Sequence, residues 1–278
     1  MALAELKLGR SAYGGDPEGY HAARPDYPAR LFELIGARCA IGPATRAFEI
    51  GPGTGKATRP MLELGLRSVV GVEPDARLAD YLRAKIADPR LRLEVAPFED
   101  ADLPEGSFEL GYAASSFHWL DMVPALEKVA RLLKPGGTWA MWWNIHQDPD
   151  RPGPFGDAIT PLIRQLRAEA PSFRNEPRDA LPGGLPLVMA RTLQVDERVA
   201  ELRAAGFSDI EHELIRDEAC FDTAAIRALY GSFAMMRDVA PERAEAFLDR
   251  LVEIVETEFG GQVRRACVMP VYTARRPL

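Results

Sequence analysis

The chain contains few of the residues from which disulfide scaffolds and zinc sites are built. Its 278 residues include three cysteines and four histidines, and no two cysteines stand in a Cys-x-x-Cys pair. Cys39, Cys220 and Cys267 are an odd number at wide spacing, which argues against a disulfide framework and a structural zinc site. This pattern is typical of a reducing compartment, so we expect a cytoplasmic protein without cross-links.

Long apolar runs and excess positive charge are also missing. The N-terminal residues Met1–Glu5 show no basic segment followed by an apolar core, so we expect no secretory signal. No apolar run approaches the ~20 residues that span a bilayer. Lysine and arginine number 34 against 41 acids, a formal net charge of −7, whereas nucleic-acid binders need a basic face. We expect neither a nucleic-acid nor a membrane partner, and a monomer or homodimer.

What the chain does contain is an alternation of short apolar segments with amphipathic ones. Segments typical of buried strands occupy residues 47–50, 68–73, 91–98, 108–114 and 138–145. Segments with helical spacing of apolar residues occupy 27–38, 54–64, 75–87 and 122–133. Apolar strands separated by helices predict a parallel sheet that is covered on both faces.

The pattern changes after Asn144. Residues 147–155 and 170–186 are rich in proline, glycine and charge, which predicts loops around a short helix at 158–167. The remaining chain predicts helices at 196–205, 223–233 and 241–259, and strands at 209–221 and 263–275. We therefore expect a sheet domain with a largely helical cap, supplied by the N-terminus and by the segments after Asn144.

A glycine-rich turn, Glu49-Ile50-Gly51-Pro52-Gly53-Thr54-Gly55, follows the first predicted strand. Glycine lets the backbone turn tightly and approach a ligand. A phosphate-binding P-loop would need glycine at position 50 and serine or threonine at 57, where Ile50 and Ala57 stand. A dinucleotide fingerprint would need its third glycine at position 56, which is Lys56. The P-loop is excluded and the dinucleotide site is disfavoured.

An acidic residue, Glu73, ends the next predicted strand. A carboxylate at that place can accept hydrogen bonds from both ribose hydroxyls of an adenosine, while Glu49 lies beside the loop at the end of the first strand. Taken on the residues alone, two alternatives stay open. The loop could be a tight turn without a ligand, and Glu73 could be a surface acid at a strand end.

Two segments, Glu49–Thr58 (EIGPGTGKAT) and Val72–Asp75 (VEPD), resemble motif I and its successor in class I S-adenosylmethionine-dependent methyltransferases. Further segments resemble later elements of that family in the same order: Ala96–Leu110, Ser115–Trp119 and Arg131–Asn144. The resemblance implies S-adenosylmethionine as the cofactor and S-adenosylhomocysteine as the product. It also implies cofactor contacts from the glycine loop and from the strand ends that follow it: Glu49, Gly51, Gly53, Thr54, Gly55, Glu73, Pro74, Phe98, Glu99, Ser115 and Ser116.

The N-terminus resembles the opening of small-molecule methyltransferases of the type 11 and type 25 kind, related to the trans-aconitate type. The matching residues are an aromatic residue, a tyrosine and an Arg-Pro-x-Tyr-Pro series: Tyr13, Tyr20, Arg24, Pro25, Tyr27 and Pro28. The resemblance implies a lid over the methionine end of the cofactor, with Tyr20 and Arg24 close to its carboxylate.

The resemblance implies a fold and a division of the chain. The fold is α/β, a Rossmann-like, doubly wound, mostly parallel seven-stranded sheet with its last strand antiparallel, plus a helical cap over the active site. The expected parts are an N-terminal lid with the first helix (1–44), a cofactor-binding core (45–145), a cap insertion of loop and helix (146–195) and the C-terminal part of the sheet (196–278). The last part carries a helical insertion at about 222–260.

Histidine 118 is the candidate catalytic residue. It follows the fourth strand, at the sheet edge where ligands bind in open α/β folds. We hypothesise that His118 orients or deprotonates the methyl acceptor and that Trp119 forms an apolar wall. The alternative is that His118 is a hydrogen-bonded structural residue. Further candidate acceptor contacts are Tyr13, His21, His146 and Tyr230, where a solvated lid position for His21 and a core position for Tyr230 are the alternatives.

The favoured function is methyl transfer to a small molecule, with O-methylation of a carboxylate or hydroxyl preferred. N- or C-methylation and a non-catalytic adenosylmethionine-binding module stay open, and Lys56 disfavours an NAD-dependent oxidoreductase. Nucleic-acid or protein methylation is disfavoured by the acidic charge and by the lack of an Asn/Asp-Pro-Pro-Tyr motif. His146, Asp148 and Asp150 lie in a proline-rich loop that would not converge them, so we expect no metal.

Overall fold

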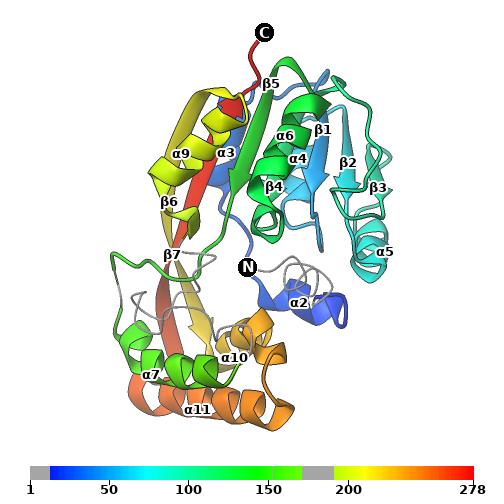
Figure 1. Ribbon diagram of the computed structural model, residues 1–278. Helices are drawn as coiled ribbons and strands as arrows, with labels where there is room; N and C mark the ends of the chain where they lie inside the picture. The colour runs from blue at the N-terminus through cyan, green and yellow to red at the C-terminus, as the bar shows by residue number, and fades with distance from the viewer. Residues whose placement is uncertain (1–12, 152, 171–190) are drawn as a thin grey trace. The chain divides into compact units, whose positions relative to one another are not determined.

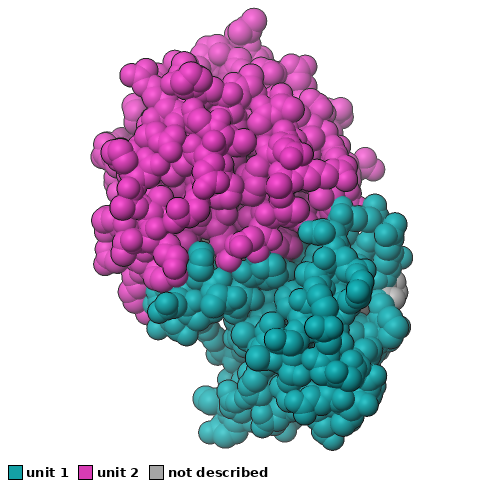
Figure 2. Space-filling view, turned by 180° about the vertical axis from the view of Figure 1, so that it is seen from behind, with its two compact units in different colours: residues 1–25, 145–191, 216–268 teal, residues 26–144, 192–215, 269–278 magenta. Residues whose placement is uncertain are grey.

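The computed structural model describes residues 13–151, 153–170 and 191–278. Residues 1–5 and the predicted loop at 170–186, apart from Ala170, lie outside that part of the chain. The described residues form two compact units (Figure 2). Of the described residues, unit 1 contains 13–25, 145–151, 153–170, 191 and 216–268, and unit 2 contains 26–144, 192–215 and 269–278.

The strands form a seven-stranded sheet in the order β3-β2-β1-β4-β5-β7-β6 (Figure 1). Neighbouring strands are parallel from β3 to β5, and β7 is antiparallel to β5. The predicted α/β class, the mostly parallel sheet and the antiparallel last strand are confirmed. The strand bounds are β1 (Arg46–Ile50), β2 (Ser68–Val72), β3 (Leu91–Glu94), β4 (Phe108–Ala114), β5 (Leu133–Trp142), β6 (Ser208–Asp222) and β7 (Gln262–Arg275).

Alternate residues of the strands in unit 2 face opposite sides of the sheet. On one side, Leu110 and Tyr112 of β4 belong to a buried cluster with residues of α3 (Ala29–Arg38), α4 (Thr58–Glu63) and α5 (Ala76–Lys85). On the other side, the ring of Phe48 stacks at 6.2 Å from Phe98 and at 6.3 Å from Trp139, measured between ring centroids.

Two more helices belong to unit 2: α6 (Met122–Leu132) and α9 (Val195–Ala204). The ammonium group of Lys128 in α6 donates to the carbonyl of Phe98 at 2.7 Å, so α6 lies on the Phe98 side of the sheet. Trp139, Trp142 and Trp143 are all fully buried, so these tryptophans pack in the core.

Unit 1 contains α2 (Pro17–Ala23), α7 (Pro154–Glu169), α10 (Thr223–Gly231) and α11 (Pro241–Phe259), together with parts of β6 and β7. Its core is a cluster of buried apolar residues from α7, α10 and α11, and this cluster includes Tyr230, Met235 and Met236. Within the described residues, no helix has both the length and the apolar character needed to cross a bilayer.

Some element boundaries differ from the sequence-based expectation, each for a local reason. Helix α2 was not predicted, although Asp16 caps it by accepting a hydrogen bond from the Gly19 amide at 2.9 Å and Pro17 occupies its first position. Helix α7 begins at Pro154 rather than Ala158, because a proline fits the first turn. The helix after the glycine loop begins at Thr58 rather than Thr54, since residues 53–57 form turns.

Candidate functional site

The three glycines of the loop after β1 have different neighbours. All three have positive φ, with 65° at Gly51, 56° at Gly53 and 85° at Gly55. A Cβ on Gly51 would lie 2.7 Å from the Cβ of Ser116, and one on Gly55 would lie 2.5 Å from Leu82 in α5. A Cβ on Gly53 would meet no described atom within 4 Å. Gly51 and Gly55 therefore allow close packing, whereas the backbone at Gly53 faces open space.

The carboxylate of Glu73 lies at the end of β2 and joins the loop to it. One oxygen accepts a hydrogen bond from the Gly53 amide at 2.9 Å, and the other accepts one from the Asp75 amide at 3.0 Å. The side chain is 3% exposed, and this burial raises its pKa to about 7, although the backbone hydrogen bonds act in the opposite direction. Each carboxylate oxygen has two lone pairs, so each retains one for a further donor.

A second buried carboxylate, Glu49, lies at the end of β1. Its Oε2 accepts hydrogen bonds from the hydroxyls of Thr58 at 2.7 Å and Tyr112 at 3.0 Å. Its Oε1 is buried and has no hydrogen-bond partner among the described residues. Burial raises the pKa of Glu49 to about 7, and the two hydroxyl donors lower it. The free oxygen is an acceptor without a donor, which is costly in a buried site.

The segment after β4 is tied to both neighbouring strands. Ser115 has a left-handed backbone conformation, with φ of 55°, which costs free energy in a residue other than glycine. Its hydroxyl lies 3.0 Å from the hydroxyl of Tyr27 and accepts a hydrogen bond from the Asn144 amide at 3.0 Å. The hydroxyl of Ser116 donates to the carbonyl of Ile50. These contacts fix the segment that leads to His118.

His118 is buried and contacts two tryptophans. The indole Nε1–H of Trp143 donates to His118 Nδ1 at 3.0 Å, and the ring centroid of Trp119 lies 4.7 Å away. An indole nitrogen is only a donor, so Nδ1 carries no proton and the neutral imidazole carries its proton on Nε2. A fully protonated ring would lose the hydrogen bond from Trp143. This geometry makes Nε2 a hydrogen-bond donor and favours the orienting role over proton abstraction.

The remaining predicted cofactor residues lie in different surroundings. Thr54 is buried and Pro74 is half-buried, both close in sequence to the Glu73–Gly53 contact. Phe98 is buried in the aromatic cluster with Phe48, and the Lys128 ammonium lies 5.1 Å from its ring centroid. Glu99 is exposed. The carboxylate and glycine part of the prediction is thus brought together within unit 2.

The predicted lid residues form a separate group within unit 1. The guanidinium of Arg24 lies 5.2 Å from the ring centroid of Tyr20 and 4.8 Å from that of Phe233, and it donates to the carbonyl of Ser232 at 3.1 Å. Its Nη1 lies 3.5 Å from Nε2 of His146. Burial lowers the pKa of His146 well below its ordinary value, and the charge of Arg24 adds to this effect.

Three other predicted acceptor contacts, Tyr13, His21 and Tyr230, also belong to unit 1. The ring centroids of Tyr13 and Tyr20 lie 4.8 Å apart with the rings tilted by 44°, and burial raises the pKa of Tyr13 to about 12. Tyr230 is 2% exposed within the core of unit 1, and His21 is half-buried.

The acidic residues near His146 are engaged by an arginine. Arg216 donates to Asp148 at 3.0 Å and to Asp150 at 2.8 Å. Within the described residues, no three histidine, cysteine, aspartate or glutamate side chains are grouped so that they could hold a metal ion.

Comparisons with known proteins found methyltransferases that are similar to this chain. Residues 48–141, which contain β1 to β4 and most of β5, match the model of a family described as a methyltransferase domain. An uncharacterized methyltransferase of Schizosaccharomyces pombe is 26% identical over 251 residues, covering 90% of this chain and 89% of that protein.

Solved structures share the fold. A protein of Anaeromyxobacter dehalogenans, provisionally assigned as a type II methyltransferase, matches with a TM-score of 0.63 at 20% identity, over 91% of this chain and 98% of its own. Phosphoethanolamine N-methyltransferase 2 of Haemonchus contortus, solved with phosphomonomethylethanolamine and S-adenosylhomocysteine, matches with a TM-score of 0.56 at 16% identity. The match covers 100% of this chain and 61% of that one.

Residues 48–141 are therefore similar to a methyltransferase domain, and the sheet has the fold of solved methyltransferases. The resemblance inferred from the ordered motifs is confirmed at this level. The relation to the trans-aconitate type stays a prediction.

Sequence reasoning missed several residues that build this candidate site. Thr58 and Tyr112 hold Glu49, Tyr27 contacts Ser115, and Trp143 sets the protonation of His118. Tyr112 and Trp143 lie in or next to apolar strands, where nothing in the sequence separates a hydrogen-bonding role from core packing. Thr58 carries a weak signal, because a hydroxyl at the start of the helix after the loop can reach back to the preceding strand.

The buried carboxyl of Glu49 predicts a pH dependence of stability in the ligand-free methyltransferase. Because its pKa is raised from about 4.5 to about 7, its favourable contribution is fully present below pH 4.5 and is lost as the pH rises to 7. The loss is about 3 kcal/mol. Glu49→Gln removes this titration, so its free energy of unfolding should fall less between pH 4.5 and 7.5 than that of the wild type.

Urea unfolding at a series of pH values measures this difference. Glu63→Gln, at an exposed position of α4, is the control and should follow the wild-type curve. Parallel curves for Glu49→Gln and the wild type would show that Glu49 is already ionised at low pH and that the predicted cost of its burial is wrong.

Proposed function

We propose that this chain transfers the methyl group of S-adenosylmethionine to a small-molecule acceptor, by O-methylation of a carboxylate or hydroxyl, and releases S-adenosylhomocysteine. The observation that carries the cofactor part is the Glu73 carboxylate, which is held between the amides of Gly53 and Asp75 with one lone pair left on each oxygen. Two such acceptors beside an open glycine backbone fit the two hydroxyls of a ribose.

The charged groups also fit the other end of the cofactor. Glu49 offers a buried acceptor oxygen that has no partner among the described residues, which suits an ammonium or another N–H donor. Arg24 forms no ion pair within the described part of the chain, so its guanidinium suits the methionine carboxylate, next to Tyr20. Gly51, Thr54, Gly55, Pro74, Phe98, Glu99, Ser115 and Ser116 complete the proposed cofactor contacts.

The cofactor, when bound, supplies a methyl group already activated by a sulfonium, so the protein has mainly to position the acceptor. His118 would do so by donating its Nε2–H to an acceptor oxygen, since the hydrogen bond from Trp143 holds Nδ1 unprotonated. A carboxylate acceptor needs no base, which suits a histidine in this state. Other proposed acceptor contacts are Tyr13, His21, Trp119, His146 and Tyr230.

The raised pKa of Glu73 predicts how affinity for S-adenosylhomocysteine changes with pH. Only the ionised carboxylate accepts two ribose hydroxyls, so affinity should rise about tenfold per pH unit below pH 7 and level off above it. Glu73→Gln should weaken binding about 100-fold at pH 8, because hydrogen bonds to a charged group are lost. Isothermal titration calorimetry from pH 5.5 to 8.5 measures both effects.

In the same titrations, Glu63→Gln should bind like the wild type. Equal affinities for Glu73→Gln and the wild type at pH 8 would remove the ribose role of Glu73. Affinity that is constant with pH for the wild type would instead show that Glu73 is ionised throughout.

Transfer itself is tested with methyl-labelled S-adenosylmethionine and a metabolite extract. The wild type should move label into at least one small molecule, found by mass spectrometry, and Glu73→Gln should not do so at cofactor concentrations that saturate the wild type. If S-adenosylhomocysteine binds but no acceptor is labelled, the chain is a cofactor-binding module and the transferase proposal fails. The mass and stability of the product distinguish an ester or ether from N- or C-methylation.

His118 is tested with the acceptor that this assay identifies. His118→Ala should lower kcat about tenfold, because one positioning hydrogen bond is lost, without changing the shape of the pH profile. His118→Gln should recover part of the loss, since its amide can donate a similar hydrogen bond. Loss of the acidic limb of the pH profile in His118→Ala would show that His118 acts as a general base instead.

A further inference from the structure

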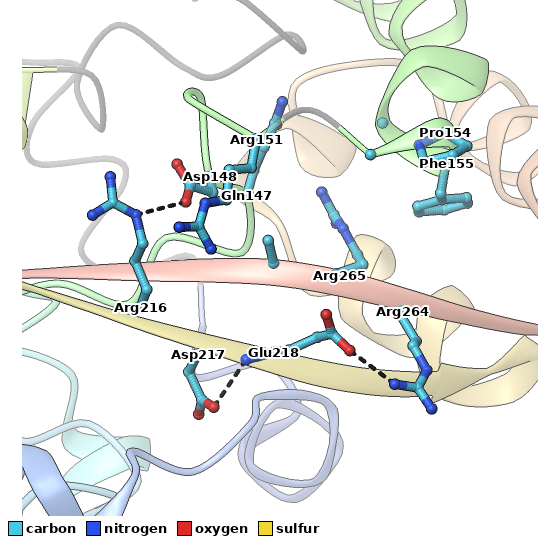
Figure 3. Close-up of a pocket in the computed structure, with 13 residues that line it drawn as sticks. Gln147, Asp148, Arg151, Pro154, Phe155, Arg216, Asp217, Glu218, Arg264 and Arg265 are labelled. Atoms are coloured by element: carbon cyan, nitrogen blue, oxygen red, sulfur yellow. Dashed lines mark hydrogen bonds and ion pairs between the residues drawn. The ribbon is translucent and has the colours of Figure 1, made fainter.

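Unit 1 contains a pocket of about 660 Å³ whose lining includes none of the proposed cofactor or acceptor residues (Figure 3). Its walls come from three segments: the chain before α7 with the first turn of that helix, residues 216–218 of β6 and residues 264–266 of β7. All three segments belong to unit 1.

Arginines and acids line this pocket, but they are not paired one to one. Arg216 is bound to Asp148 at 3.0 Å, and Arg264 is bound to Glu218 at 3.1 Å. The other two arginines of the lining, at positions 151 and 265, form no ion pair within the described residues. The remaining acid, at position 217, is exposed, and Figure 3 shows it pointing away from the arginine at 265.

Arg265 is the unusual member of the lining, because it is only 7% exposed and has no carboxylate partner among the described residues. Its Nη1 donates to the hydroxyl of Tyr230 at 2.7 Å, and its guanidinium lies 5.3 Å from the Tyr230 ring centroid and 5.5 Å from that of Phe155. These contacts offset part of the cost of burying the charge. A guanidinium has five N–H donors, so most of them are left for another acceptor.

The N-terminus of α7 adds partial positive charge to the same pocket. Gly153, Pro154, Phe155 and Gly156 line it, and no side chain of the described residues caps the helix there. Helix N-termini favour anions through their free amides and the helix dipole. Figure 3 shows Arg265 projecting from β7 toward Phe155 at this helix start, with Arg151 on the same side.

We propose that this pocket binds an oxyanion, a carboxylate or a phosphate group, with Arg265 as its main partner and Arg151 as the second. A planar guanidinium pairs with either group through two parallel hydrogen bonds, and the first turn of α7 supplies amide donors. The aromatic contacts of Arg265 hold its guanidinium in place before the anion arrives. None of these residues belongs to the cofactor loop, which is part of unit 2.

Inorganic phosphate and succinate are the probes, titrated by isothermal calorimetry at constant ionic strength. The wild type should show saturable binding of at least one probe, and Arg265→Gln should weaken it about tenfold or more. Arg264→Gln is the matched control, since it changes the neighbouring exposed arginine of the same strand, and it should bind like the wild type. Stronger binding of phosphate assigns the site to phosphate groups, and stronger binding of succinate assigns it to carboxylates.

Arg151→Gln, at an exposed position, keeps the proposal testable if Arg265→Gln does not fold, and it should weaken binding about threefold to tenfold. S-adenosylhomocysteine affinity, measured on the same samples, should be unchanged in Arg264→Gln and Arg151→Gln. The proposal is overturned if the wild type binds neither probe, or if the folded variants at 265 and 151 bind as tightly as the control.

Discussion

The carboxylate of Glu73 accepts hydrogen bonds from Gly53 and Asp75, and the arrangement of the candidate cofactor site depends on those two contacts. They hold the turn after β1 against the end of β2, which is the neighbouring strand in the sheet. The turn can lie there because Gly51 and Gly55 leave room for Ser116 and Leu82. The backbone at Gly53 is then fixed in place while its open side stays accessible.

This arrangement has a cost in stability. Glu49 and Glu73 end adjacent parallel strands, both are buried, and burial raises the pKa of each to about 7. Their mutual repulsion adds to the increase for Glu49. Two desolvated acids do not help the chain to fold at neutral pH, but they are suited to a ligand that brings hydroxyl and ammonium donors. Conflicts of this kind between local stability and ligand binding are expected at functional sites.

Polar side chains outside the glycine loop are also held in a fixed orientation by their neighbours. The hydrogen bond from Trp143 leaves His118 with its proton on Nε2, so this nitrogen acts as a hydrogen-bond donor rather than as a base. Tyr230 and Phe155 hold Arg265 without neutralising it. In each case an aromatic side chain from the core fixes the orientation of a polar group. The chemistry of these polar groups is therefore set by residues that look like ordinary core from the sequence.

The sequence predicts some features of the fold and of the candidate site but not others. The sheet was predictable because buried parallel strands are short apolar runs. Ile50 and Ala57 exclude a P-loop and Lys56 disfavours a dinucleotide site, but the cofactor class was inferred only from the resemblance of the ordered motifs to a known family. Helix α2 was missed although Asp16 and Pro17 mark its start. Two boundaries between the units fall inside β6 and β7, and these could not be predicted because composition does not change there.

Contacts between residues that are far apart in the sequence could not be predicted either. The hydrogen bond between Trp143 and His118 joins residues 25 positions apart, and the lack of an acidic partner for Arg265 depends on which side chains the fold brings near it. The spacing of residues along the chain predicts neither the Trp143–His118 hydrogen bond nor the surroundings of Arg265.

The central claim, that Glu73 and the glycine loop hold the adenosine of S-adenosylmethionine, is tested most directly by a crystal structure with S-adenosylhomocysteine bound. The account predicts both ribose hydroxyls within hydrogen-bonding distance of the two Glu73 oxygens, with the ligand over the open face of Gly53. A ligand bound elsewhere, or a ribose that does not contact Glu73, would contradict it.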